Sequence, residues 1–236
     1  MAYRDLYAKW QADPEGWWME AAGAVDWVQK PSHALNATRA PFFEWFTDAQ
    51  VNTCWNAVDR HVLAGRGKQA AIIHDSPVTG TRHVITYAEL QDRVARLAGA
   101  LRAKGVEKGD RVIIYMPMVP EALEAMLACA RLGAIHSVVF GGFAANELAV
   151  RIDDCTPKAI IAASCGIEPN RVVHYKPLLD GAIEMATHKP EFCVILQREQ
   201  VVAKLVEGRD VAQKRELAGV FTREMARIFG CSEAAI

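Results

Sequence analysis

The sequence predicts an α/β fold: a three-layer sandwich with a mostly parallel sheet flanked by helices, preceded by a tryptophan-rich irregular extension. Short runs that are apolar on both faces are typical of buried parallel strands, and here they alternate with helix-length amphipathic segments. The extension is indicated by tryptophan, because all six tryptophans precede Arg60. We therefore expect an extension over residues 1–60, an α/β subdomain over 61–200 and a helical tail over 201–236.

The N-terminal extension is expected to be irregular, since Pro14, Pro31 and Pro41 prevent it from forming one long helix. Its tryptophans have two interpretations. Rigid indole rings can anchor a loop-rich segment on a neighbouring domain, or they can form a stacking platform for a sugar or a base. We favour the first interpretation and predict that the extension packs on the core.

The first helix of the regular part is predicted to begin after Thr86. Thr86 followed by Glu89 is a capping-box signature, in which each side chain binds a backbone N–H of the other residue. Apolar residues then recur at helical spacing, and Gly105 is placed to end the helix. These apolar residues are Leu90, Val94, Leu97, Ala98 and Leu101.

A strand, a helix and a second strand are predicted in "RVIIYMPMVPEALEAMLACARLGAIHSVVF". The apolar run 112–115 must end before Pro117, and Pro120 suits the first turn of a helix that closes at Gly133. Residues 134–140 form the next predicted strand. We expect the helix to bury an apolar stripe that consists of Leu123, Met126, Leu127 and Ala130.

The same alternation continues along the chain. A helix through Leu148 and Ile152 precedes a strand at 159–163, and a helix at 178–185 precedes a strand at 192–196. Strand and helix in regular alternation predict parallel pairing, with helices on both faces of one sheet.

Ligands of such open sheets lie beyond the carboxyl ends of the strands, and this rule places a candidate site at Phe140, Gly141 and Gly142. The glycine pair lets backbone amides approach a bound group, or it forms a tight turn with nothing bound. Spacing leaves both interpretations open, because "FGGFAANE" is not the G-x-G-x-x-G pattern.

The tail carries apolar residues at helical spacing in "VAQKRELAGVFTREMARIFG", residues 211–230. An apolar stripe needs a partner surface. We expect it to dock on its own sheet, with association with another chain as the alternative.

Composition excludes several classes of function. The net charge of −1, with acidic and basic residues interspersed, offers no basic surface for nucleic acid or an anionic membrane. The chain shows neither a transmembrane-length apolar run nor a signal-peptide pattern, so we expect a cytoplasmic protein or one of the mitochondrial matrix. The seven histidines and six cysteines lack metal-ligand spacing, so we expect no protein-bound metal and reduced cysteines.

Three segments resemble one family of enzymes: "YMPMVPEALEAMLACARLGAIHSVVFGGF", "WFTDAQVNTCWNAVDRHV" and "ITYAELQDRVARLAGAL". Their sequences resemble the N-terminal part of AMP-forming acetyl- and propionyl-CoA synthetases, in the adenylate-forming superfamily. The resemblance runs from about Trp27 to Leu196.

The resemblance implies a reaction in two steps. A short-chain carboxylate, propionate or acetate, attacks the α-phosphate of ATP with Mg²⁺ present, and the thiol of coenzyme A (CoA) then takes the acyl group from the acyl-adenylate. The family's phosphate loop, which reads like Y-T-S-G-T-T-G-x-P-K-G, is absent from these residues, as is its catalytic lysine segment. We therefore expect a truncated, N-terminal portion of such an enzyme, with no catalytic residue in this chain and no formation of acyl-CoA by itself.

The resemblance also implies part of a CoA site. The family places the adenosine 3′-phosphate against the segment that reads "SCGIEPNRVVHYKP" here, and Gly142 matches its contact glycine. Acetyl-CoA synthetases carry R-x-x-R in that segment, whereas this chain has Glu168 at the first position and Arg171 at the second. This departure leans toward the propionyl-CoA branch and puts the 3′-phosphate clamp in doubt. Arg171 as a solvated surface residue is the alternative.

Two functions follow as hypotheses. The first is the N-terminal portion of an ATP-dependent, AMP-forming ligase that makes acyl-CoA. The second is a non-catalytic CoA-binding or assembly module that has kept the fold, and the missing phosphate loop keeps this second hypothesis open.

Overall fold

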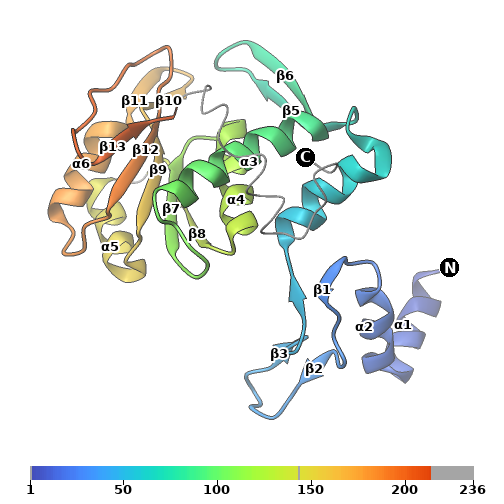
Figure 1. Cartoon of the computed structure of the whole chain (residues 1–236). Coiled ribbons are helices and arrows are strands. Elements are labelled where there is room, and N and C mark those ends of the chain that lie inside the picture. The colour runs from blue at the N-terminus through green and yellow to red at the C-terminus, as the bar shows by residue number, and fades with distance from the viewer. Residues whose placement is uncertain (1, 143, 214–236) are drawn as a thin grey trace. The chain divides into compact units, whose positions relative to one another are not determined.

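The computed structural model of the chain describes residues 2–142 and 144–213. The chain divides into two compact units, Met1–Ala57 and Val58–Ile236. Each unit contains helices and strands of its own (Figure 1).

The N-terminal unit opens with two helices, so the prediction of an irregular extension is wrong for these residues. Helix α1 spans Tyr3–Ala12 and α2 spans Pro14–Ala22. Pro14 occupies the first turn of α2, where an N–H has no partner within the helix. The Asp13 side chain caps this helix by accepting a hydrogen bond from the Gly16 N–H at 2.9 Å. Pro14 therefore starts a helix, where the sequence predicts only a break.

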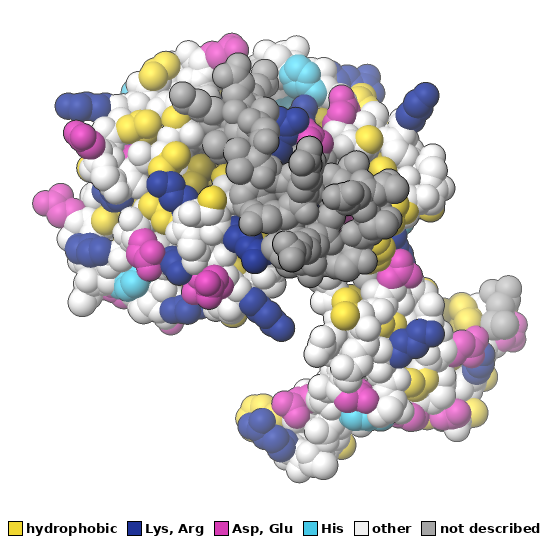
Figure 2. Space-filling view, in the orientation of Figure 1, with side chains coloured by type: hydrophobic (Ala, Val, Ile, Leu, Met, Phe, Trp, Pro, Cys, Tyr) yellow, Lys and Arg dark blue, Asp and Glu magenta, His cyan; other side chains and the backbone are white. Residues whose placement is uncertain are grey.

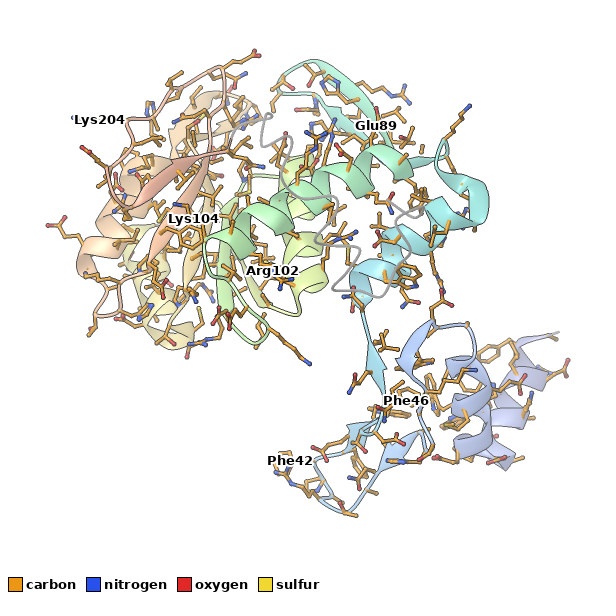
Figure 3. The ribbon with its side chains drawn as sticks, in the orientation of Figure 1. Phe42, Phe46, Glu89, Arg102, Lys104 and Lys204 are labelled. Atoms are coloured by element: carbon orange, nitrogen blue, oxygen red, sulfur yellow. The ribbon has the colours of Figure 1, made fainter. Side chains whose placement is uncertain are left out.

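Four short strands complete the N-terminal unit. They are β1 (Trp27–Gln29) paired with β4 (Gln50–Val51), and β2 (Leu35–Asn36) paired with β3 (Glu44–Trp45), both antiparallel. Trp18 contacts Trp45 with ring centroids 5.1 Å apart, and Trp27 contacts Phe46, labelled in Figure 3, at 5.4 Å. The described ring contacts of the tryptophans lie inside this unit, so its packing on the core stays a prediction.

The second unit is built around a five-stranded sheet in the order β13-β12-β9-β7-β8. The strands are β7 (Arg111–Met116), β8 (Ile135–Phe140), β9 (Ala159–Ala163), β12 (Phe192–Leu196) and β13 (Asp210–Ala212). Every pairing is parallel, and Ile114 of β7, which lies between β8 and β9, is opposite Val138 on one side and Ile161 on the other. The predicted parallel sheet is confirmed.

Helices cover both faces of this sheet (Figure 1). They are α3 (Tyr87–Ala103), α4 (Pro120–Leu132), α5 (Ala145–Cys155) and α6 (Tyr175–Met185). The chain runs from β7 through α4 to β8, then reverses through α5 to β9 and through α6 to β12. Because such crossovers are right-handed, the reversal places α5 and α6 on the face opposite to α4, against which α3 packs. The predicted three-layer sandwich is confirmed.

Helix α3 begins as its capping signature predicts. The Thr86 hydroxyl accepts a hydrogen bond from the Glu89 N–H at 3.3 Å, and the Glu89 carboxylate accepts one from the Thr86 N–H at 2.8 Å. Glu89 lies at the first turn and Arg102 at the last (Figure 3), so both charges complement the helix dipole. Gly105 follows the helix with a φ of +87°, which favours glycine.

Helix α4 buries a different face from the predicted one. Leu123 of the predicted stripe is 40% exposed. The buried residues are Ala122, Glu124, Ala125, Ala128 and Cys129. Small side chains let α4 approach its neighbours closely, and Glu124 is tolerated because Arg93 of α3 pairs with it at 3.2 Å. The stripe prediction is wrong because it chose the larger apolar side chains. The face that α4 buries consists mainly of small residues, which allow close packing.

Four further features were not predicted. Two antiparallel hairpins are β5 (Ala70–Ser76) with β6 (Thr81–Thr86), and β10 (Cys165–Glu168) with β11 (Arg171–His174). Two π-helical turns, η1 (Trp55–Asp59) and η2 (Val62–Arg66), precede the first hairpin.

Strand β13 corrects the start of the predicted helical tail. Val211 and Ala212 lie opposite Val194 and Ile195 of β12, so the chain extends the sheet at this point. The remainder of the predicted helix, residues 214–230, lies outside the described residues.

Candidate functional site

The candidate site lies along the carboxyl ends of β8, β9 and β12, where an open α/β sheet places its ligands. Ser164 follows β9 directly and is fully buried. Its carbonyl oxygen accepts hydrogen bonds from the backbone N–H groups of Tyr175 (3.1 Å) and Lys176 (3.5 Å). Its hydroxyl oxygen accepts one from the Arg198 backbone N–H at 2.9 Å. Ser164 therefore joins the end of β9 to the start of α6 and to the loop after β12.

The hairpin β10–β11 carries two of the predicted site residues. Glu168 ends β10 and Arg171 begins β11, directly opposite in the strand register. The Arg171 Nε donates a hydrogen bond to Glu168 Oε2 at 2.8 Å, and both side chains are exposed. This bond lowers the pKa of Glu168 and raises the pKa of Arg171. Glu168, which stands where acetyl-CoA synthetases have the first arginine of R-x-x-R, therefore neutralises Arg171, the second arginine.

The Tyr175 ring links this hairpin to the glycine pair after β8. A Cβ on Gly141 would lie 2.3 Å from the Tyr175 hydroxyl oxygen, and a Cβ on Gly166 of β10 would lie 2.6 Å from the same atom. Both glycines therefore make room for one buried ring. The ring stacks on Tyr115 of β7 with centroids 5.1 Å apart. Four elements of the edge thus meet at Tyr175.

Gly142 lies in the turn after β8, next to the position that contacts Tyr175. A Cβ at Gly142 would lie 2.7 Å from Cε1 of Phe140, so this glycine makes room for a ring of the protein itself. Of the three predicted site residues, Glu168 and Arg171 are in contact. Among the described residues, no hydrogen bond or ion pair joins either of them to Gly142.

Burial raises the pKa values of the two tyrosines behind the carboxyl edge, Tyr115 and Tyr175. Burial, and then the nearby Tyr175, raises the pKa of Tyr115 to about 12. Burial also raises the pKa of Tyr175, the Glu168 carboxylate adds to this rise, and the Arg198 guanidinium opposes it. Charges of opposite sign from Glu168 and Arg198 therefore have opposite effects on the pKa of this hydroxyl.

Arg198 occupies the carboxyl end of β12, two residues after the strand ends. The residue is half-buried, and its guanidinium donates a hydrogen bond from Nη1 to the Cys165 carbonyl oxygen at 3.2 Å. Arg198 forms no ion pair with a carboxylate in the described part of the chain. A cation at the ligand edge is thus held in place by a neutral backbone oxygen.

A cluster of buried charges fixes α6 and β13 beside this edge. Lys176, buried in the first turn of α6, contacts Asp210 at 2.9 Å and Asp180 at 2.6 Å. Arg209 Nε contacts Asp210 at 2.7 Å, and its Nη2 also pairs with Asp180. Burial acts to raise the pKa of Asp210, but hydrogen bonds from Arg209, the Val206 N–H and Lys176 outweigh it, so that pKa is lowered.

Sequence reasoning missed three residues of this site, Ser164, Tyr175 and Arg198. The rule that located Gly141 could have found two of them, because Ser164 and Arg198 are the polar residues that follow two buried apolar strands. Tyr175 carries no such signal. Its role depends on two glycines that are distant in the sequence and give it space.

The face drawn in Figure 2 adds no second candidate among the described residues. Figure 2 shows basic and acidic side chains interspersed over the visible face of both units. Within residues 2–142 and 144–213, no group of three or more His, Cys, Asp or Glu side chains could hold a metal ion, so we assign Mg²⁺ to no residue of this chain. Nor does a helix in this part of the chain have the length and apolarity needed to cross a bilayer.

Comparison with known proteins agrees with this geometry. Residues 59–227 match the family model of AMP-binding enzymes, and residues 3–57 match the model of the acetyl-coenzyme A synthetase N-terminus. In a solved structure, acetoacetyl-CoA synthetase from Streptomyces lividans, the similar fold gives a TM-score of 0.76 at 21% identity, covering 86% of this chain and 31% of that one.

Curated relatives are more similar in sequence. An uncharacterized protein of Pseudomonas aeruginosa is 54% identical over 211 residues, 89% of this chain and 34% of the relative. The mitochondrial acyl-CoA synthetase short-chain family member 3 of Rattus norvegicus is 46% identical over 217 residues, 92% of this chain and 32% of the relative. Propionate–CoA ligase of Escherichia coli is 41% identical over 211 residues, 89% of this chain and 33% of the relative.

These matches cover most of this chain and a minor part of each relative. The chain spans at most 34% of the length of these three curated relatives. The AMP-binding model alone covers residues 59–227, well over half of the 236 residues. The chain therefore belongs to the family of AMP-binding enzymes, with an N-terminal segment of the acetyl-coenzyme A synthetase type.

Proposed function

We propose that this chain forms the CoA-facing portion of an AMP-forming, short-chain acyl-CoA ligase. The complete enzyme would use ATP with Mg²⁺ to convert propionate or acetate to an acyl-adenylate and pass the acyl group to CoA, in the cytoplasm or the mitochondrial matrix. One observation supports the proposal: in a chain that matches the AMP-binding family, polar groups gather at the carboxyl edge of the sheet. They are Glu168 and Arg171 on the hairpin and the backbone of Gly142 after β8.

The hairpin pair suggests how a phosphate would bind. Arg171 and Glu168 are 70% and 45% exposed, and pairs this accessible to water contribute little to stability. A phosphate dianion offers the guanidinium a stronger, charge-assisted partner than the carboxylate does. Arg171 can therefore exchange Glu168 for a phosphate oxygen at low cost, and Gly142 leaves backbone exposed in the turn after β8.

Propionate is the acid that we favour. The curated relatives include a propionate–CoA ligase at 41% identity and the short-chain family member 3 at 46%. An acetyl-coenzyme A synthetase of Streptomyces avermitilis is 44% identical over 207 residues, so acetate stays an alternative. The departure at Glu168 from the R-x-x-R of acetyl-CoA synthetases supports propionate.

The runner-up function is a non-catalytic module that binds CoA or assembles with another chain. It is favoured by one observation, the absence of the family's phosphate loop from the 236 residues. The reading frame of the source gene after Ile236 separates the two functions, because a continuing frame that encodes the loop supports the ligase.

Isothermal titration of the purified chain with CoA tests the proposed site. We expect saturable binding that weakens in Arg171→Ala, with Arg82→Ala, which removes an equally exposed arginine from the hairpin β5–β6, as the control. We also expect Glu168→Gln to strengthen binding, since it releases Arg171. Equal isotherms for the wild type and Arg171→Ala would remove this residue from the site.

A further inference from the structure

Most cations near the candidate site have an anionic partner. Arg171 pairs with Glu168, while Lys176 and Arg209 share Asp180 and Asp210. Such pairs neutralise a positive charge before any ligand arrives. An anion that binds at this edge would gain most from a cation that is not neutralised.

Arg198 has that property. It does not appear in any ion pair of the described residues, and its Nη1 is bonded to a neutral carbonyl, that of Cys165. A guanidinium carries five N–H donors in a planar fork, so further donors stay available for a ligand. Half-burial removes part of the water around the charge, which makes a bound counter-anion more favourable than at an exposed site.

The position of Arg198 is fixed by its backbone. The bond from its N–H to the buried Ser164 hydroxyl ties the residue to the end of β9, and the Cys165 carbonyl orients the guanidinium. Cys165 is the first residue of β10, and a Cβ on the next residue, Gly166, would lie 2.6 Å from the Tyr175 hydroxyl oxygen. The Arg198 guanidinium is thus held against β10, the strand that ends at Glu168.

We propose that Arg198 binds a phosphate group of coenzyme A and supplies the cation that is missing where Glu168 replaces the first arginine of R-x-x-R. The inference rests on the proposed CoA site and adds to it a residue outside the hairpin. Arg198 is then the principal phosphate cation, and Arg171 is the second, which Glu168 holds until the ligand binds. The phosphate is either the 3′-phosphate or the diphosphate of CoA.

Titrations of the 236-residue chain with CoA and with dephospho-CoA, which lacks the 3′-phosphate, test the inference. Arg198→Gln should weaken CoA binding by about tenfold or more, the loss expected for a charge-assisted hydrogen bond to phosphate. A loss confined to CoA identifies the 3′-phosphate, and an equal loss for both ligands identifies the diphosphate. Arg102→Gln, an exposed arginine at the end of α3, is the control and should bind both ligands as the wild type does.

Several outcomes overturn the inference. Wild-type affinity of Arg198→Gln for both ligands, with Arg171→Ala still weakened, removes Arg198 and leaves the proposed CoA site standing. A wild-type chain that binds neither ligand counts against both. If Arg198→Gln does not fold, the Nε–H resonance of Arg198 is followed in the wild-type chain by NMR, and it should shift on addition of CoA. An unchanged resonance at saturating CoA contradicts the inference.

Discussion

Tyr175 shows how much of this site depends on single residues. Its hydroxyl occupies the space that a Cβ would take on Gly141 and on Gly166, and its ring is 6% exposed. Stacking on Tyr115 holds the ring from the other side. The two glycines are therefore required by the close approach of a rigid aromatic ring, and their φ angles are not in the left-handed region.

We expect Gly166→Ala to destabilise the chain, because the added methyl group meets Tyr175 Cε1 at 2.7 Å and the ring has little room to move. Overpacking of this kind costs about 1–3 kcal/mol in the free energy of unfolding. Urea denaturation measures it. The control is Gly67→Ala, where the new Cβ would find its nearest neighbour at 3.6 Å. Equal denaturation midpoints for Gly166→Ala and Gly67→Ala would show that the close approach of Tyr175 does not require glycine at position 166.

Ser164 supports the site in a different way. In Ser164→Ala the Arg198 N–H loses its acceptor at a half-buried position, which costs about 0.5–1.5 kcal/mol in the free energy of unfolding. We expect CoA binding to weaken as well, since the loop that carries Arg198 would lose its anchor. Denaturation and titration on the same sample check both effects. Full CoA affinity in a destabilised variant would show that the anchor does not position Arg198.

At the scale of elements, the buried charge cluster joins α6 to β13. The Asp210 side chain is fully buried between Lys176 and Arg209. Lys176→Met removes one partner and leaves buried negative charge poorly compensated, so we expect a loss of about 3–5 kcal/mol in the free energy of unfolding. Lys204→Met, at an exposed position labelled in Figure 3, is the control. A similar denaturation midpoint for both variants would contradict this role of the cluster.

The same cluster predicts a dependence on pH. Because the pKa of Asp210 is lowered from its ordinary value of 3.8, its contribution to stability is present above that value and is lost as the pH falls through the folded pKa. Asp210→Asn removes this contribution, so its unfolding free energy should decline less between about pH 5 and about pH 2.5. Parallel curves for the variant and the wild type would contradict it.

The sequence predicts some elements better than others, for physical reasons. Helix α3 and strands β7, β9 and β12 are set by local signals, a capping box and runs that are apolar on both faces. The buried face of α4 is set by the distance at which it meets α3 and the sheet, which no local pattern contains. The hairpin β10–β11 is short and partly polar, so its alternation is too brief to predict a strand pair.

At the scale of the whole molecule, the sheet order explains why the site is at one edge. The strands of this sheet are all parallel, so the carboxyl ends of β8, β9 and β12 lie at the same edge. The sequence locates this edge through Gly141 and Gly142, but it does not indicate that Ser164, Tyr175 and Arg198 also lie there. Arg171 is found through its motif, whereas the pairing that neutralises it is a property of the folded hairpin.

We expect the purified 236-residue chain to release no pyrophosphate above background when mixed with ATP, Mg²⁺ and propionate or acetate. The physical reason is that no glycine-rich phosphate loop is present among these residues to neutralise the charge that develops on the phosphates. A coupled pyrophosphate assay measures it, and turnover above background contradicts the expectation.

We propose that CoA binds along the carboxyl edge of this parallel sheet. Hydrogen–deuterium exchange of the chain with and without CoA tests it most directly, because it reports where along the backbone a ligand acts. We predict slower exchange in the hairpin β10–β11, in the turn that contains Gly142 and around Arg198. Protection confined to the opposite, amino edge of the sheet, or no change at saturating CoA, would contradict the account.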